Sequence, residues 1–152
     1  MKTDTDKQYM ELALQEAQKA LEMDEVPIGA IVICDGKIVG RGYNLKEELQ
    51  DPTAHAEMIA IREASQNMGS WRLPECELYV TLEPCPMCIG AMIQARIKRL
   101  VYGASDEKGG ATGSLYNLAE DERFNHQIEV VSGVLADKSS KMLKDFFRSL
   151  RT

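Results

Sequence analysis

The chain alternates short apolar runs, rich in β-branched residues, with longer segments whose apolar residues repeat at helical spacing. Helices are expected over about 5–23, 54–67, 86–95, near 114–120 and over 137–151. Strands are expected over 28–34, 37–44, 78–82, 97–103 and 128–131. A hairpin turn is predicted at Asp35-Gly36, and an exposed loop at 104–113. This alternation favours an α/β fold in which helices cover both faces of a central sheet. Because helical crossovers are expected after residue 78, the strands there should be parallel.

With 152 residues and neither an internal repeat nor a low-complexity linker, the chain is expected to form a single domain over 1–152. Its 18 basic and 24 acidic residues give a net charge of −6, so bulk charge does not predict non-specific nucleic-acid binding. A local basic face is still compatible with this total. The first seven residues lack the apolar core of a signal peptide, and no apolar run approaches the roughly 18 residues of a membrane span. We therefore expect a cytoplasmic protein with reduced cysteines and no membrane partner.

A close cysteine pair, Cys85 and Cys88, lies where an expected strand ends and a helix begins. At this spacing both sulfurs lie on one side of the first turn, where the positive end of the helix favours the thiolate. Two such thiolates form half of a zinc site. Taken alone, the pair is as compatible with a thiol–disulfide active site or half of a structural zinc knuckle.

His55 and Glu57 begin another expected helix. A histidine in this position is more often a cap or a hydrogen-bonded core residue than a ligand. The neighbours of Glu57 are apolar, however, and burying an unpaired carboxylate costs several kcal/mol or raises its pKa. Because residues i and i+2 do not share a helix face, the two side chains are not expected to bind one ion together. One metal ligand, His55, and one proton-transfer group, Glu57, fit the pattern better.

His55, Cys85 and Cys88 supply three ligands, the number typical of catalytic zinc, which keeps its fourth position for water. A closed structural site needs a fourth ligand, for which the chain offers His126, Cys34 and Cys76. The plainer interpretation is a turn or cap role for that histidine and core packing for those cysteines. Zinc lowers the pKa of water to about 7, and Glu57 could move the released proton to a ring nitrogen and then to a leaving amine. This chemistry is hydrolytic deamination.

The H-x-E of 55–57 and the P-C-x-x-C of 84–88 form the signature of zinc-dependent nucleobase deaminases. The chain resembles the bacterial tRNA-specific adenosine deaminases over nearly its full length. The matching stretches are 25–30, 52–57, 78–88, 101–104, 113–115, 124–126, 133–135 and 145–148. The resemblance implies a three-layer αβα cytidine-deaminase-like fold with a five-stranded mixed sheet. It also implies a homodimer with one Zn²⁺ per subunit on His55, Cys85 and Cys88, and a catalytic Glu57.

The resemblance further implies a substrate: adenosine at the wobble position of a tRNA anticodon, hydrolysed to inosine with release of ammonia. It assigns base contacts to the side-chain amide of Asn44 and the backbone N–H of Ala56. It assigns contacts with the tRNA anticodon loop to Phe147 and Arg148. Because the zinc motif is shared across the superfamily, the alternative is a deaminase of a free base or nucleoside, such as guanine or cytosine. A zinc-stabilised binding module and a dithiol redox protein are alternatives of other classes.

The last expected helix carries basic residues at steps of three or four: Lys138, Lys141, Lys144, Arg148 and Arg151. Apolar residues are expected on its opposite side: Met142, Leu143, Phe146 and Leu150. Phe147 lies near the border between them. Such a basic stripe is usually a solvated face. Beside a nucleobase site it predicts phosphate contacts, with Phe147 placed to stack on a splayed loop base.

Overall fold

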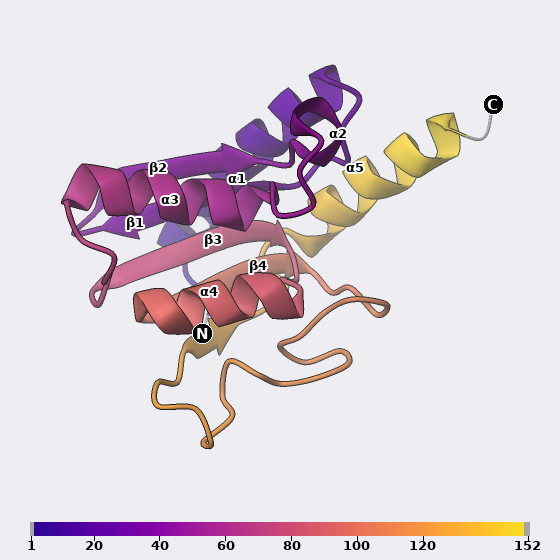
Figure 1. The fold of residues 1–152 in the computed structure, drawn as a ribbon. Helices are drawn as coiled ribbons and strands as arrows, with labels where there is room; N and C mark the ends of the chain where they lie inside the picture. The colour runs from indigo at the N-terminus through magenta and orange to yellow at the C-terminus, as the bar shows by residue number, and fades with distance from the viewer. Residues whose placement is uncertain (1, 151–152) are drawn as a thin grey trace.

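The structure is a computed structural model that describes residues 2–150 (Figure 1). Its helices are α1 (Asp4–Glu22), α2 (Lys46–Leu49), α3 (Ala56–Met68), α4 (Pro86–Ala95) and α5 (Ala136–Ser149). Its strands are β1 (Gly29–Cys34), β2 (Lys37–Tyr43), β3 (Cys76–Leu82), β4 (Arg99–Ala104) and β5 (Glu129–Val131). Within this described range, no helix is both long and apolar enough to cross a membrane. Arg151, the last member of the predicted basic stripe, lies outside it.

The five strands form one mixed sheet in the order β2-β1-β3-β4-β5. β1 pairs antiparallel with both β2 and β3, whereas β3–β4 and β4–β5 are parallel. The predicted five-stranded mixed sheet and its parallel second half are therefore confirmed. Every residue of β1 is buried, as expected for a central strand covered on both faces.

Helices cover both faces of this sheet, which confirms the three-layer arrangement (Figure 1). α3 and α4 pack on one face around a core that includes Leu78 and Met92. α1 and α5 pack on the other face, where Met10 and Val101 belong to a second core. The sheet thus separates two apolar layers.

The absence of side chains at two glycines of β2 fixes the position of α3. A Cβ atom at Gly40 would lie 2.2 Å from the carbonyl oxygen of Ala60, and one at Gly42 would lie 2.3 Å from that of Ala56. Any larger residue would therefore push the helix away from the sheet. Because His55 immediately precedes α3, this close packing also determines where the histidine lies.

The connection between β4 and β5 differs from the prediction. The described residues 105–128 contain no helix, so the short helix expected near 114–120 and a helical crossover at this point are wrong. The backbone has other partners here: Thr112 and Asn117 form an isolated bridge, and Thr112 and Ser114 donate their N–H groups to Glu83. The loop at 104–113 is also not uniformly exposed, since 110–112 are buried. The short helix α2 was not predicted.

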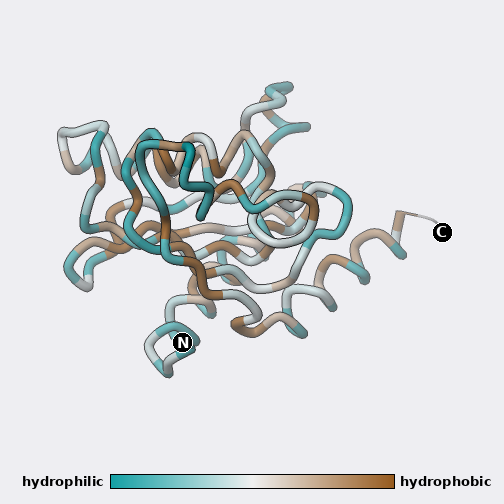
Figure 2. Tube along the Cα trace, turned by 90° about the horizontal axis from the view of Figure 1, so that it is seen from below, coloured by the Kyte–Doolittle hydropathy of each residue, from teal (hydrophilic) through white to brown (hydrophobic). Residues whose placement is uncertain are grey.

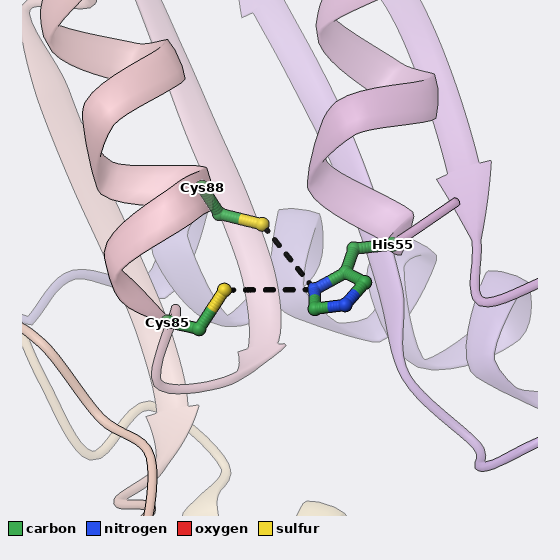
Figure 3. A group of neighbouring side chains, drawn as sticks. All are labelled: His55, Cys85 and Cys88. Atoms are coloured by element: carbon green, nitrogen blue, oxygen red, sulfur yellow. Dashed lines mark hydrogen bonds between the residues drawn. The ribbon is translucent and has the colours of Figure 1, made fainter. Parts of the chain in front are cut away.

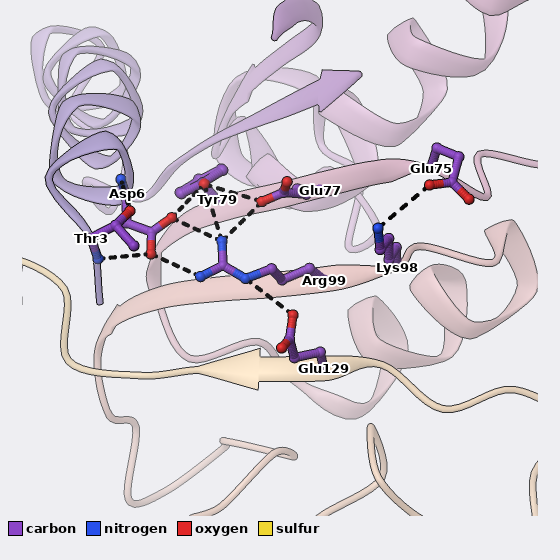
Figure 4. Close-up of polar contacts among 8 residues, drawn as sticks. All are labelled: Thr3, Asp6, Glu75, Glu77, Tyr79, Lys98, Arg99 and Glu129. Atoms are coloured by element: carbon purple, nitrogen blue, oxygen red, sulfur yellow. Dashed lines mark hydrogen bonds and ion pairs between the residues drawn. The ribbon is translucent and has the colours of Figure 1, made fainter. Parts of the chain in front are cut away.

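An ionic network joins α1 to β3, β4 and β5 (Figure 4). Arg99, at the start of β4, donates two hydrogen bonds of 2.8 Å to Asp6, which also accepts one of 2.7 Å from Tyr79. Glu77 and Glu129 lie 2.9 and 3.2 Å from the same guanidinium. The Arg99 hydrogen bonds hold the pKa of Asp6 at about 2, although burial opposes them. The network is therefore structural and separate from the candidate site.

Candidate active site

Two helix starts bring three metal-binding side chains together. His55 is the N-cap residue of α3, and Cys85 is the N-cap residue of α4, which begins just after β3 ends. Pro86 occupies the first helical position, where no N–H is needed, and Cys88 follows within the same turn. Both sulfurs point at the imidazole (Figure 3). The Nδ1 atom of His55 lies 3.6 Å from Sγ of Cys85 and 3.5 Å from Sγ of Cys88.

The geometry and chemistry of these donor atoms fit a zinc ion. Zinc–ligand distances of about 2.3 Å for sulfur and about 2.1 Å for nitrogen, at a tetrahedral angle, separate the two donors by about 3.6 Å. Both observed distances agree with this value, and all three donor atoms lie within 4.8 Å of one another. No other group of three histidine, cysteine or acidic residues in 2–150 is arranged to hold a metal ion in this way. This donor set can therefore hold a metal.

Hydrogen bonds within the site separate the pKa values of the two thiols. A hydrogen bond from the Cys88 thiol lowers the pKa of Cys85 to about 4, and His55 acts in the same direction against the effect of burial. The same hydrogen bond, together with burial, raises the pKa of Cys88. The Cys85 sulfur in turn raises the pKa of His55. Cys85 is therefore an anionic sulfur at neutral pH, the form in which cysteine binds metals.

Glu57 lies beside this donor set, on the first turn of α3. Its side chain is only 4% exposed, and it lines the same cavity as His55 and Cys85. Burial raises the pKa of Glu57 to about 7. A carboxyl group with a pKa near neutrality can both accept and donate a proton at physiological pH. The structure thus places a buried carboxyl group in the cavity that His55 and Cys85 line, and its role in proton transfer stays a prediction.

The cavity has a volume of about 750 Å³ and includes both predicted base contacts, Asn44 and Ala56, in its wall. Asn44 is 3% exposed, and its Oδ1 atom has no hydrogen-bond partner among the described residues. An unpartnered buried acceptor is unfavourable. The cavity wall therefore offers this oxygen to a donor on a bound ligand.

α5 closes one side of the cavity with Leu143 and Phe147. Phe147 is 45% exposed, so its ring is available to a ligand at the cavity mouth. A smaller cavity of about 320 Å³ adjoins the first through these two residues and is also lined by Lys144 and Arg148. Phe147 thus lies at the main cavity, whereas Arg148 lies beside it.

The described basic residues of α5 are all exposed, as a basic stripe requires, but they line two different cavities. Lys138 forms an ion pair with Glu11 of α1, and Lys141 forms one of 2.7 Å with Asp145. Both lysines line a groove between α1 and α5. Of the basic residues that the structure describes in α5, Lys144 and Arg148 lie next to the candidate site, and Arg148 also lies 3.9 Å from Asp145.

The expected apolar side of α5 is divided in the same way. Met142 and Phe146 face the groove with α1, whereas Leu143 faces the cavity. Leu150 is 65% exposed. Figure 2 shows α5 running out from the body, with hydrophobic and hydrophilic residues alternating along it. The apolar side of the helix therefore has two neighbours, α1 and the cavity.

The other candidate ligands lie elsewhere. Cys34 and Cys76 face each other as a register pair on β1 and β3, and both are buried. Burial raises the pKa of Cys76 to about 12, which makes it a poor metal ligand. The Nε2 atom of His126 lies 2.8 Å from the carbonyl oxygen of Ile97. Core packing agrees with the plainer interpretation of the two cysteines. The contact of His126 is with a residue 29 positions earlier in the chain, so it is neither the turn nor the cap that was expected.

Three parts of the cavity wall were not predicted: Lys46 of α2, the loop 105–108 and Glu83. Lys46 and the loop carry no local sign of a site, because only the tertiary fold brings them to it. Glu83 could have been found. It stands between Leu82 and Pro84 at the end of an apolar strand, and the argument used for Glu57 applies equally to it.

A family model, a sequence relative and two solved structures that match this chain are all those of deaminases. The profile of the MafB19-like deaminases matches residues 4–151. A tRNA-specific adenosine deaminase from Bacillus subtilis (strain 168) is 54% identical over 146 residues, which are 96% of this chain and 91% of the relative. A solved structure from work on A-to-I editing by tRNA:A34 deaminases at the wobble position of transfer RNA superposes with a TM-score of 0.86. Its sequence is 48% identical, and the match covers 90% of this chain and 99% of that one. A guanine deaminase from Bacillus subtilis is 38% identical with a TM-score of 0.62, over 69% of this chain and 66% of that one.

Proposed function

This chain belongs to the MafB19-like deaminase family and to the tRNA-specific adenosine deaminases, and from this premise we propose how its residues act. The reaction is the hydrolysis of adenosine 34, at the wobble position of a tRNA anticodon, to inosine with release of ammonia. The observation that carries the proposal is the convergence of His55, Cys85, Cys88 and Glu57 on one cavity that Phe147 borders. A single domain over 1–152 holds all of these residues.

His55, Cys85 and Cys88 hold one Zn²⁺ per subunit in this proposal. Their imidazole nitrogen and two sulfurs are the donor types that zinc prefers, and their spacing suits tetrahedral coordination. Zinc bound there supplies a Lewis acid that lowers the pKa of water to about 7. The low pKa of Cys85 means that one thiol needs no further deprotonation for binding.

Glu57 is the proposed general base and acid. It takes one proton from the water that attacks C6 of adenine and passes it to N1. It then passes the remaining hydroxyl proton of the C6 adduct to the amine, which leaves as ammonia while the C6 carbonyl forms. A pKa near 7 suits both halves of this transfer. Because Glu57 is buried in the cavity wall, its carboxyl group is kept from bulk solvent during the reaction.

Asn44 and Ala56 orient the base. The free Oδ1 of Asn44 accepts a hydrogen bond from the nucleoside, and the backbone N–H of Ala56, at the start of α3, donates one. Phe147 stacks on a neighbouring base of the anticodon loop, and Arg148 contacts its phosphates together with Lys144. Single-stranded loops with splayed bases are the RNA elements best suited to such contacts.

We also propose that the enzyme is a cytoplasmic homodimer. α4 carries no charged residue, and its outer surface presents the partly exposed Met87, Gly90 and Ala91. An uncharged helix face of this kind suits a second copy of the chain. Sedimentation at micromolar concentration tests this, with Ala91→Glu expected to give monomers.

The function is tested by incubating the purified protein with unmodified tRNA transcripts and locating inosine by sequencing. Inosine at position 34, with about one zinc per chain by metal analysis, is the expected result. The similarity to a guanine deaminase makes guanine the natural competing substrate. Release of ammonia from guanine but not from tRNA would refute the proposed substrate and leave the deaminase chemistry standing.

A further inference from the structure

Two buried glutamates, Glu25 and Glu83, take no part in the chemistry described above. Glu25 is 1% exposed and Glu83 is 2% exposed. Burying a carboxylate is unfavourable unless strong hydrogen bonds replace its hydration. In both residues these hydrogen bonds come from backbone N–H groups of segments that line the cavity.

Glu83 holds the loop between β4 and β5. Its carboxylate accepts hydrogen bonds from the N–H groups of Asp106 at 3.0 Å, Thr112 at 3.1 Å and Ser114 at 3.0 Å. The hydroxyl of Ser114 donates a fourth. These donors are spread over residues 106–114, so one carboxylate gathers this part of the loop. The residues 105–108 that line the cavity belong to the same loop.

The loop is packed so closely on Glu83 that only glycine fits at position 110. A Cβ atom at Gly110 would lie 2.2 to 2.5 Å from the carboxylate atoms of Glu83. The next residue, Ala111, donates its N–H to the carbonyl oxygen of Pro84 at 2.9 Å. The segment that carries the ligand Cys85 thus also anchors this wall of the cavity.

Glu25 holds a second wall segment in the same manner. Its carboxylate accepts the N–H groups of Glu47 at 3.2 Å and Glu48 at 2.6 Å. These residues belong to α2, which follows Asn44 and contains Lys46, both in the cavity wall. Glu25 therefore holds the chain beside the proposed base contact.

We propose that Glu25 and Glu83 are positioning residues that fix two walls of the cavity and so determine how well the anticodon loop is bound. The inference rests on the proposed function for the identity of the substrate. The segments that they hold end in exposed polar or charged side chains, such as Lys46 and Lys108, rather than in metal ligands. Loss of either carboxylate therefore weakens tRNA binding more than it slows the chemical step.

The test uses Glu25→Gln and Glu83→Gln in the full-length zinc enzyme, with Glu75→Gln as the control. Glu75 is exposed and lies in an ion pair with Lys98, away from the cavity. With an anticodon stem-loop as substrate, each variant should raise KM by about tenfold or more, keep kcat within about threefold and retain zinc. Hydrogen exchange should rise by about tenfold at the amides of 106, 112 and 114 only in Glu83→Gln. It should rise similarly at 47 and 48 only in Glu25→Gln, whereas the control changes neither.

Gly110→Ala provides an independent perturbation of the same contact. It should reproduce the KM increase of Glu83→Gln, and the double variant should be no worse than either, because both changes release one loop. If Glu83→Gln does not fold, Ser114→Ala removes one hydrogen bond and should give a smaller change of the same kind. An unchanged KM and unchanged exchange would overturn the proposal. So would a loss of zinc or of kcat at constant KM, since that places Glu83 in the metal site. Wild-type protein that forms no inosine refutes the proposed function alone, because the exchange pattern still decides whether the two glutamates hold these segments.

Discussion

The division of the basic residues of α5 predicts which of them contact tRNA. Lys144 and Arg148 lie next to the cavity that holds the candidate metal site, whereas Lys138 and Lys141 line the groove between α1 and α5. Ion pairs do not separate the two sets, because Asp145 pairs with both Lys141 and Arg148. Replacing the first pair by alanine should weaken binding of an anticodon stem-loop. Replacing the second pair should not, although it removes the same charge from the same helix. Both double variants should unfold within about 1 kcal/mol of wild type, because exposed ion pairs contribute little to stability.

The expected size of the effect follows from counterion release. Each phosphate contact with single-stranded nucleic acid contributes about 0.7 to the slope of log Kd against log salt. Losing two contacts should reduce that slope by about 1.4. Raising the salt concentration fourfold should then weaken wild-type binding about sevenfold more than that of the Lys144/Arg148 variant. Fluorescence anisotropy with a labelled stem-loop over a salt series measures this. Equal slopes for the two double variants would refute the division of the helix.

Three further predictions concern chemistry and stability. Glu57→Gln should retain zinc by metal analysis but lower the rate of inosine formation by about 10²-fold or more, the usual contribution of a general acid–base group; turnover within threefold of wild type would remove Glu57 from that role. Arg99 holds the pKa of Asp6 at about 2, against an ordinary 3.8, so its carboxylate stabilises the fold above about pH 4 and loses this effect as the pH falls towards 2. Asp6→Asn should therefore lower the free energy of unfolding at pH 7 by about 2 kcal/mol and flatten its decline below pH 4, as measured by urea titration. Gly42→Ala, whose Cβ would lie 2.3 Å from the Ala56 carbonyl, should destabilise the protein by about 1–3 kcal/mol and weaken zinc binding; unaltered zinc affinity would contradict the link between β2 and His55.

The parts of the fold that could be predicted are those with a local cause. The helix α1 and the turn at Asp35-Gly36 each follow from residues close together in the sequence, and both are present in the structure. The segment 114–120 was wrongly expected to be helical because the N–H groups of Thr112 and Ser114, where it begins, bond to Glu83, about thirty residues earlier in the chain. No local pattern reports such a partner. For the same reason, the sequence could not predict that α5 contacts two different cavities, since helical spacing gives the faces of a helix but not their neighbours.

The three candidate ligands could be identified from the sequence because each lies at an expected helix start, where residue type and position together limit the chemistry. No local pattern shows that the two helix starts meet; the ligand count suggested it and the resemblance to known deaminases implied it. The structure supplies the physical reason: α3 and α4 pack on the same face of the sheet, and the glycines of β2 let α3 come close enough for His55 to reach the cysteines.

The pKa values of two buried glutamates near the candidate metal site shift in opposite directions, for reasons of both burial and hydrogen bonding. Burial would raise the pKa of Glu83, but the Ser114 hydroxyl and the N–H groups of its loop leave that pKa below the ordinary value. Glu57 accepts from its own N–H and from Cys88, which is too little to offset its burial, so its pKa rises to about 7. A fully satisfied carboxylate is a fixed anion that can hold a loop but cannot exchange protons at neutral pH. A buried carboxyl group with few hydrogen-bond donors can exchange protons at neutral pH. Burial and the number of hydrogen-bond donors together therefore separate the proposed proton carrier from the proposed positioning residue.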